Sequence, residues 1–381
     1  MGSIDMGREY APSLQADPLG PGVDLSAGVL RCAQARDAYA ESRRAVPKQG
    51  LRTAPCAYHT ATMNVARTQQ IMTLVLATMA LVWFWAWASR GQWALASLAI
   101  LTGLPHAPAL ALELFWAAYL ARHESARRAA GPDSAPPQTH PGGLTWLRAG
   151  CHEALLAIRV FGWQQPWAHA VHDDHLPPDA LGRRGVLLVH GFYCNRGFWN
   201  TWMPLLRREG IPFVAVTLGP PQAGIAQQAR GIEQAVLRLT ELTGSAPLLV
   251  GHSMGGLVIR SWLGSQPEAA ALQHEVITIG SPHHGTALAR LARSPAAIEM
   301  RLGSDFLRGL MARETQARRS RLTCYWSVCD NIVFPASAAT LAGAHNIALQ
   351  GLPHVGLAMA APVLNDVLQR LGAQPGDQAL Y

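Results

Sequence analysis

The sequence predicts an α/β fold, in which a mostly parallel sheet carries helices on both faces, preceded by one or two transmembrane helices. From residue 185 onward, short apolar runs alternate with stretches of helical spacing, which is typical of parallel βαβ units. Before that point lie two long apolar segments. The chain is 49% hydrophobic and only 14% charged, whereas an average protein is about 25% charged. Such a composition favours a large core together with membrane segments.

The formal net charge of +7 does not indicate a nucleic-acid partner. The arginines are scattered and no nucleic-acid-binding motif accompanies them, so we interpret them as flanks of apolar segments and as surface residues. The six cysteines form no Cys-X-X-Cys pair, which argues against a zinc site or a thioredoxin-like motif. We expect free thiols in a reducing compartment, with no metal and no cofactor.

Residues 1–62 are rich in Gly, Pro, Ala and Arg without a sustained apolar period, and we interpret them as a disordered N-terminal extension. They lack the short apolar core and cleavage site of a secretory signal. Met63 begins a more conventional N-terminus, which suggests that residues 1–62 are an upstream extension of the reading frame.

A membrane segment is predicted over residues 63–124, with spans at about 71–89 and 93–121. The first span contains no charged residue and nearly crosses the roughly 30 Å hydrocarbon core of a bilayer. The second contains Glu113 and two prolines, so the alternative is one span followed by a re-entrant or surface helix. We favour a hairpin of two spans.

Arginine and lysine residues precede the first span and follow the second, whereas the short connection between the spans contains only Arg90. The positive-inside rule then places both ends of the hairpin in the cytoplasm. A single span would instead place the C-terminal domain on the outer side.

Residues 125–143 form a predicted linker rich in Pro, Ala, Ser and Gly, and residues 144–381 form the folded domain. Residues 145–162 have near-helical spacing and are expected to pack on that domain or on the membrane surface. Residues 287–319 interrupt the alternation and are predicted as a helical cap. The remaining elements are strands at 186–190, 213–218, 247–251, 276–279, 322–327 and 345–349, and helices at 199–209, 225–243, 254–264 and 360–371.

The motif Gly251-His252-Ser253-Met254-Gly255 follows a predicted buried strand and precedes a predicted helix. In this G-x-S-x-G context a nucleophilic serine stands on a sharp, strained turn. A side chain at Gly251 or Gly255 would collide with neighbouring backbone, and His252 belongs to the same supporting turn. We therefore predict Ser253 as the nucleophile. The alternative is an ordinary glycine-rich turn with a helix-capping serine.

A second motif, Val189-His190-Gly191-Phe192, follows the first strong strand of the domain and resembles the oxyanion loop of lipases. The backbone N–H groups of Phe192 and Met254 are the expected oxyanion donors. Gly191 lets the loop approach the substrate, and His190 is expected to orient the loop. The nearby aromatic residues suit either core packing or an acyl-chain wall: Phe192, Tyr193, Phe198 and Trp199.

A serine nucleophile needs a histidine base, and that histidine needs an acid to fix its tautomer. Asp330 lies three residues beyond the strand at 322–327, and His354 follows the last strand. This matches the chain order Ser, Asp, His that the G-x-S-x-G context implies. Four other downstream candidates fit less well: Asp305, Asp366, His274 and His345.

These motifs, with Ser281-Pro282-His283-His284-Gly285-Thr286, occur in an order that resembles a bacterial lipase or esterase of the α/β-hydrolase superfamily. The resemblance covers about residues 185–371 and implies that fold, hydrolysis of carboxylic esters, and the triad Ser253, Asp330 and His354. The apolar spans depart from secreted lipases. They predict an enzyme of the bacterial inner membrane with a cytoplasmic hydrolase domain, acting on an ester or lipid substrate.

The pair His283-His284 suggests a metal at first sight, but no matching carboxylate cluster is evident, so we interpret the motif as a polar loop that supports the site.

One alternative function is a catalytically inactive binding or regulatory module at the membrane, or a module assisting a transporter. Others are a thioesterase, phospholipase or acyltransferase with the same site. The sequence does not specify the acyl length, the head group or the oligomeric state.

Overall fold

The structure is a computed structural model that describes residues 57–99 and 141–373. Three predictions fall wholly or mainly outside these residues: the disordered extension up to residue 56, the second span from residue 100 onward, and the linker up to residue 140. The side chains of residues 57–64 are also outside the description.

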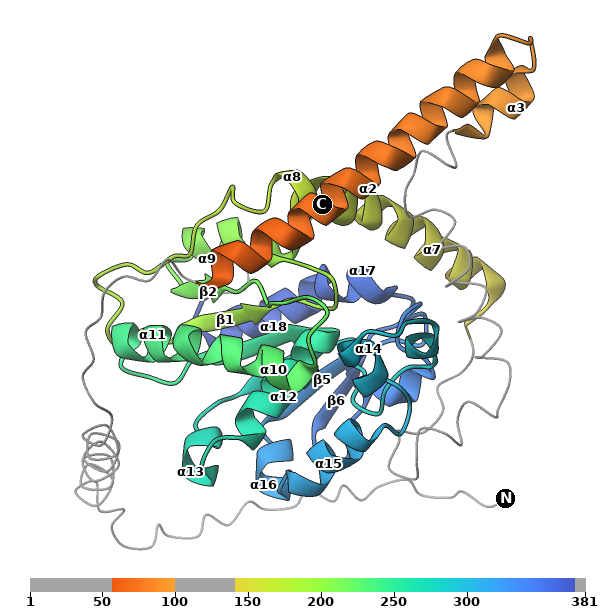
Figure 1. Cartoon of the computed structure of the whole chain (residues 1–381). Helices are drawn as coiled ribbons and strands as arrows, with labels where there is room; N and C mark the ends of the chain where they lie inside the picture. The colour runs from red at the N-terminus through yellow and green to blue at the C-terminus, as the bar shows by residue number, and fades with distance from the viewer. Residues whose placement is uncertain (1–56, 100–140, 374–381) are drawn as a thin grey trace, which may run out of the picture. The chain divides into compact units, whose positions relative to one another are not determined.

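The domain is built on a six-stranded sheet in which all neighbouring strands are parallel, in the order β2-β1-β3-β4-β5-β6 (Figure 1). This confirms the predicted fold class. The strand order reverses between β1 and β3, and a crevice opens beyond the carboxyl ends of the strands at such a switch point. The strands are β1 Val186–Val189, β2 Phe213–Ala215, β3 Leu248–His252, β4 Val276–Ile279, β5 Leu322–Trp326 and β6 His345–Ala348.

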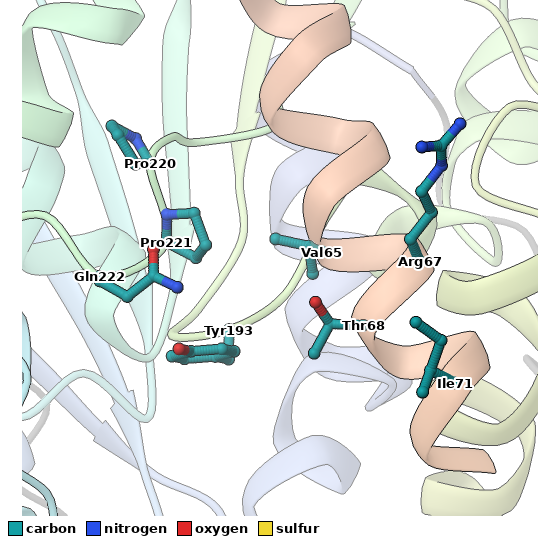
Figure 2. A pocket seen from close by; sticks show the side chains of 8 residues that line it. All are labelled: Val65, Arg67, Thr68, Ile71, Tyr193, Pro220, Pro221 and Gln222. Carbon is teal, nitrogen blue, oxygen red and sulfur yellow. The ribbon is translucent and has the colours of Figure 1, made fainter. Parts of the chain in front are cut away.

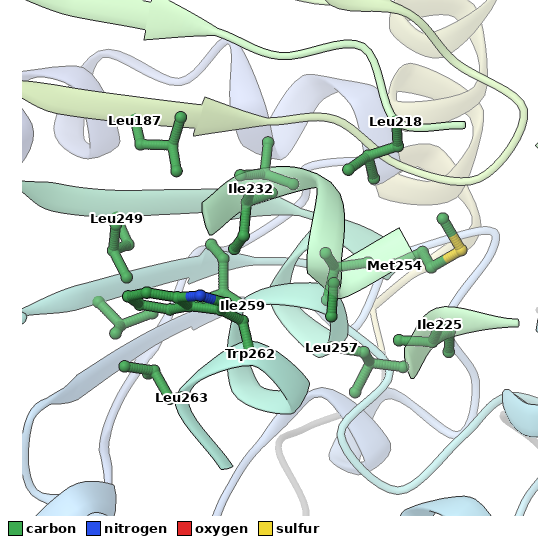
Figure 3. Close-up of a cluster of buried hydrophobic side chains, with 14 of the residues drawn as sticks. Leu187, Leu218, Ile225, Ile232, Leu249, Met254, Leu257, Ile259, Trp262 and Leu263 are labelled. Carbon is green, nitrogen blue, oxygen red and sulfur yellow. The ribbon is translucent and has the colours of Figure 1, made fainter. Parts of the chain in front are cut away.

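Alternate residues of β1 enter two different apolar clusters. Leu187 and Val189 belong to the cluster that includes much of α12, whereas Val186 and Leu188 belong to the cluster that includes residues of α9 and α18. This period of two follows from the strand geometry. Figure 3 shows the first cluster, in which Leu187 and other strand residues face the helix α12. Because both faces are covered, the central strands are buried along their full length.

Helices occur at the positions that the periodicity predicts, with some subdivision, and two further short helices that it does not predict begin at residues 268 and 354. The predicted helix at 145–162 is α7 Gly143–Ala157, continued by a π-helical segment Ile158–Gln164 and by α8 Gln165–Trp167. The other helices are α9 Met203–Arg208, α10 Ile225–Ala229, α11 Glu233–Thr243, α12 Met254–Gly264, α13 Glu268–Ala271, α17 His354–Ala358 and α18 Ala361–Arg370.

Between β4 and β5, where a cap is predicted, the chain forms short helical elements. The first is a 3-10 helix, Ala287–Leu291, and three α-helices follow: α14 Pro295–Glu299, α15 Asp305–Arg313 and α16 Gln316–Arg319. Leu307 and Leu310 of α15 are buried in the same apolar cluster as α12. The segment therefore packs on the helix that follows Ser253, and its role as a cap stays a prediction.

The N-terminal apolar segment forms the helix α2 Ala57–Ala88, followed by the short helix α3 Trp93–Ser97. Within the described residues, one helix is long and apolar enough to cross a membrane, over Val65–Ala88. The helix starts before residue 63, where the membrane segment was predicted to begin. Large apolar side chains of this helix, Ile71, Leu81 and Trp85 among them, are more than 60% exposed, as a lipid-facing helix requires.

Candidate active site

Ser253 lies on the turn between β3 and α12, at the carboxyl edge of the sheet. Its φ is +55° and its ψ −126°, a backbone conformation that non-glycine residues rarely adopt and that clusters at functional sites. The N–H of Ser253 donates to the carbonyl oxygen of Ile279 at the end of the neighbouring strand, at 2.8 Å. The turn is thus fixed by sheet pairing on one side and by the helix on the other, and it holds the hydroxyl at a sharp bend.

The two glycines of the motif occupy positions where a side chain has no room. A Cβ at Gly255 would lie 2.4 Å from the carbonyl oxygen of Val189, and a Cβ at Gly251 would lie 2.6 Å from the amide nitrogen of Gly256. Both clashes are with backbone, which cannot move aside as a flexible side chain can. These contacts agree with the collision that the sequence predicts for both positions.

The loop after β1 lies directly against the serine turn. A Cβ at Gly191 would lie only 3.0 Å from the Cβ of Ser253, so a larger residue would push the loop away. Among the described residues, no acceptor is found for the N–H of Phe192. Met254 is the first residue of α12, and first-turn N–H groups have no partner inside their own helix. Met254 thus directly follows Ser253, and Phe192 directly follows Gly191, which lies against the serine turn.

His190 connects the oxyanion loop to the segment after β2. The N–H of Leu218 donates to its Nε2 at 2.9 Å, and Nδ1 lies 2.8 Å from the carbonyl oxygen of Gly191. Because Nε2 accepts, Nδ1 carries the proton and donates to Gly191. Burial lowers the pKa of His190 to about 4, so the ring is neutral at physiological pH. These contacts agree with the loop-orienting role that we infer for His190.

Asp330 and His354 form a buried pair. The Nδ1 of His354 lies 2.9 Å from Oδ2 and 3.0 Å from Oδ1 of Asp330. The N–H groups of Ile332 and Val333 each donate to Oδ1 of Asp330 at 2.8 Å, which fixes the carboxylate. A proton on Nδ1 leaves Nε2 as the basic nitrogen, which is the tautomer that a serine nucleophile requires.

The ring of His354 packs against that of His252, the residue immediately before Ser253. The ring centroids are 4.6 Å apart, and Nε2 of His252 lies 3.2 Å from the carbonyl oxygen of His354. His252 also stacks on Phe198, with ring centroids 4.4 Å apart. The structure thus brings His354 and Asp330 to the Ser253 turn, although they follow strands far apart in the sequence.

The competing acids and bases lie in other environments. Asp305 pairs with Arg308 on the surface, and Asp366 binds Tyr325 and Arg370. His274 contacts the carbonyl oxygen of Pro247, and His345 is exposed at the start of β6. None of the four contacts Asp330 or His354 among the described contacts.

Gly280, which the sequence analysis did not single out, lies directly beside the Asp330–His354 pair. Its φ is +55°, and a Cβ there would lie 3.0 Å from Oδ2 of Asp330 and 3.1 Å from Nδ1 of His354. The position needs glycine both for its backbone conformation and for space. Its signal in the sequence is weak, because a glycine ending an apolar strand is common.

His283 from the Ser-Pro-His-His-Gly-Thr motif is fully buried and bound on both sides. Its Nδ1 accepts from Arg260 at 3.1 Å, and its Nε2 donates to the hydroxyl of Thr278 at 2.9 Å. Arg260 also makes a bidentate ion pair with Glu314, at 2.7 and 2.6 Å. The motif therefore links α12 to β4 and to the helices that follow, as expected for a supporting polar loop.

A pocket of about 370 Å³ opens next to the oxyanion loop (Figure 2). One wall is formed by α2, through Val65, Arg67, Thr68 and Ile71. The facing wall consists of Tyr193, which follows Phe192, and of residues 220–222. The N-terminal part of the apolar helix thus borders the loop that carries a predicted oxyanion donor.

A buried polar network connects α2 to the same loop. The side-chain amide of Gln69 donates to the carbonyl oxygen of Tyr193 and to Oε1 of Gln165, both at 3.2 Å. Asn195 donates through its backbone N–H to Oε1 of Gln165 at 3.0 Å. Gln69, Gln165 and Asn195 are each no more than 8% exposed. These hydrogen bonds join α2 to the loop and give its buried polar groups partners.

The chain is similar in fold to several solved lipases at low identity. It is 18% identical to Bacillus licheniformis lipase BlEst2 in mature form, with a TM-score of 0.44 over 50% of this chain and 95% of that one. It is 20% identical to Aspergillus fumigatus lipase B, with a TM-score of 0.44 over 53% of this chain and 57% of that one. It is 17% identical to phospholipase PlaB from Legionella pneumophila, with a TM-score of 0.32 over 38% of this chain and 39% of that one.

Comparison with curated proteins by sequence finds no match. The sequence profile described as the alpha/beta hydrolase family matches residues 186–378, which spans the whole sheet and all three residues of the predicted triad. The chain belongs to the α/β-hydrolase family.

Proposed function

We propose that this protein is a membrane-anchored serine hydrolase that cleaves carboxylic esters, with Ser253 as nucleophile, His354 as base and Asp330 as the acid that orients the base. The observation that carries the proposal is the buried pair of Asp330 and His354, at 2.9 Å, beside a serine held at positive φ. A serine on such a turn, beside a paired histidine and aspartate, is typical of acyl transfer through a covalent intermediate.

In the proposed reaction His354 accepts the hydroxyl proton through Nε2 while the oxygen of Ser253 bonds to the ester carbonyl carbon. The N–H groups of Phe192 and Met254 stabilise the resulting oxyanion. When the tetrahedral intermediate collapses, the carbon–oxygen bond to the alcohol breaks and the alcohol takes the proton from His354. Water then repeats the sequence on the acyl-enzyme and releases the acid.

The proposed substrate is an ester lipid that resides in the bilayer. The pocket beside Tyr193 has α2 as one of its walls, and the same helix continues as the candidate span Val65–Ala88. In this proposal the lipid reaches the oxyanion loop along the surface of this helix. We further propose that the domain lies on the cytoplasmic side of a bacterial inner membrane.

A test uses the full chain in detergent, a fluorophosphonate probe, and p-nitrophenyl esters of increasing chain length. The wild type should be labelled and should turn over esters, whereas Ser253→Ala should do neither. Ser265→Ala, at the other end of α12, is the matched control and should behave as wild type. A wild-type protein that is not labelled would support the alternative of an inactive binding module.

The ester panel also separates the other hydrolytic functions. Preference for long acyl chains would support lipid substrates, and a faster reaction with acyl thioesters than with oxygen esters would favour a thioesterase. Transfer of the acyl group to an added alcohol in preference to water would favour an acyltransferase.

A further inference from the structure

Glu153 on α7 is a buried carboxylate that the proposed mechanism does not use. Its side chain is 3% exposed and comes from a helix about 200 residues before His354 in the sequence. The N–H of Val355 donates to Oε1 of Glu153 at 2.9 Å and lies 3.1 Å from Oε2, and the N–H of Gly356 donates to Oε2 at 3.3 Å. Both amides belong to the two residues that directly follow His354.

The first turn of α17 is therefore held by side chains from two other elements. The N–H of His354 donates to Oδ1 of Asn331, the neighbour of Asp330, at 3.1 Å. The next two N–H groups bind Glu153. The first N–H groups of a helix have no partner inside the helix, and in a buried helix each unpaired group costs about 1–3 kcal/mol. Asn331 and Glu153 thus fix both the place and the direction of the backbone that carries His354.

The carboxylate also lies within electrostatic reach of the pair that it supports. Burial raises the pKa of Glu153 to about 7, while the hydrogen bond from Val355 and the charge of His354 oppose that rise and the charge of Asp330 adds to it. His354 and Asp330 are the titratable groups that interact with Glu153 in this way. His152, its neighbour on α7, has a pKa lowered by burial and is not among them.

We infer that Glu153 is a positioning residue for the proposed reaction: it ties the backbone after His354 to α7, and when ionised it places a negative charge where it favours the imidazolium form of His354. This inference rests on the proposed function. It assigns α7, the helix that directly follows the predicted linker, a part in the active site. Interactions that favour the imidazolium lower the barrier to proton transfer from Ser253.

Glu153→Gln separates the charge from the hydrogen bonds, because an amide oxygen can still accept from Val355 and Gly356. Glu153→Leu removes both. The matched control is Glu299→Gln on α14, since Glu299 also has a pKa raised by burial and also accepts an N–H at the start of another helix, from Ile225 of α10. Neither His354 nor Asp330 is among the causes of its shift.

The experiment measures the rate of fluorophosphonate labelling and kcat/KM for a p-nitrophenyl ester from pH 5 to 9, in the full chain. With Glu153→Gln we expect both profiles to follow the wild type at pH 5 to 6, where Glu153 is protonated, and to fall below it at pH 8 to 9, because the charge that favours the imidazolium is then missing. We expect Glu153→Leu to lose at least tenfold in kcat with a smaller change in KM. Glu299→Gln should match the wild type.

Hydrogen exchange of the peptide around residues 352–360 gives a readout that needs no activity. Glu153→Leu should lose protection there, and Glu153→Gln should keep it. Wild-type labelling combined with a Glu153→Gln profile that superimposes on the wild type would overturn the role of the charge. Unchanged exchange and unchanged kcat in Glu153→Leu would overturn the positioning role. Absence of wild-type labelling would instead refute the proposed function.

Discussion

The imidazole of His354 lies with its ring centroid 4.6 Å from that of His252, and this contact joins the last strand-end loop of the domain to the serine turn. His252 is held in turn by stacking on Phe198 and by the carbonyl oxygen of His354. Burial lowers the pKa of His252 well below its ordinary value, so it serves as a neutral spacer. The proposed base is thus positioned against the motif that carries the proposed nucleophile.

The contact of Asp330 with His354 leads to the first prediction. Asp330→Asn should keep the fold but place a proton on Nε2 of the imidazole, because the amide nitrogen of asparagine donates where the carboxylate accepted. We expect kcat to fall by about 10⁴-fold, as in triads in which the acid is replaced by its amide. Steady-state ester hydrolysis measures it, with Asp366→Asn as the control. A loss below tenfold would remove Asp330 from the proposed triad.

Gly280 provides a second prediction, because it borders the Asp330–His354 pair. Gly280→Ala should force the pair apart, since its Cβ would lie 3.0 Å from the carboxylate and φ is +55°. We expect at least a tenfold loss of kcat and about 1–2 kcal/mol of lost stability. Gly231→Ala is the control, because a Cβ there meets no atom within 4 Å. Wild-type kinetics for Gly280→Ala would show that the pair tolerates displacement.

The network between α2 and the oxyanion loop leads to a third prediction. Gln69→Leu removes the donor that Gln69 offers to the part-buried carbonyl oxygen of Tyr193, at a cost of about 1–3 kcal/mol, and Oε1 of Gln165 keeps only the N–H of Asn195. We expect a lower melting temperature and a lower kcat, because the loop that carries Phe192 loses a fixed contact. Thr78→Ala is the control, since its hydroxyl bonds only to its own helix, on an exposed face. Equal melting temperatures and rates for both variants would contradict the coupling.

The elements of the sheet follow from the sequence because they depend on local patterns. β4 Val276–Ile279 and α12 Met254–Gly264 match their predicted bounds. Each contains an apolar run, and a glycine marks its end: Gly280 directly follows β4, and Gly264 is the last residue of α12. The prediction of Ser253, Asp330 and His354 as a triad rests on a related pattern: each follows a strand that can be recognised, and parallel strands bring their carboxyl ends to one edge.

Glu153 and Gly280 could not be found in the same way. Glu153 lies in an amphipathic helix, where one acidic residue among apolar ones gives no sign of being buried. Its partners are amides about 200 residues away, and a backbone amide carries no sequence signal. The helix α17 was also missed, because its five residues are too few to show a period and tertiary contacts fix its start.

Buried histidines lead to a prediction for stability against pH. The folded pKa of His190 is lowered by burial to about 4 from 6.5, so between these values the unfolded chain binds a proton that the folded chain does not. The contribution of His190 to stability is therefore constant above about pH 6.5 and falls as the pH drops toward 4, by roughly 3 kcal/mol. Thermal unfolding in detergent should show the decline, and His190→Asn should show a shallower one. Parallel curves for the two proteins would contradict the contribution of His190.

The last prediction concerns the side of the membrane on which the domain lies. If both ends of the apolar hairpin are cytoplasmic, an alkaline phosphatase fused after Arg128 should be inactive, because that enzyme needs the oxidising compartment outside the inner membrane. A fusion after Arg90, in the connection between the spans, should be active and serves as the control. Activity at both sites would mean that only α2 crosses the bilayer. The catalytic domain would then face outward, and its lipid substrates would come from the opposite leaflet.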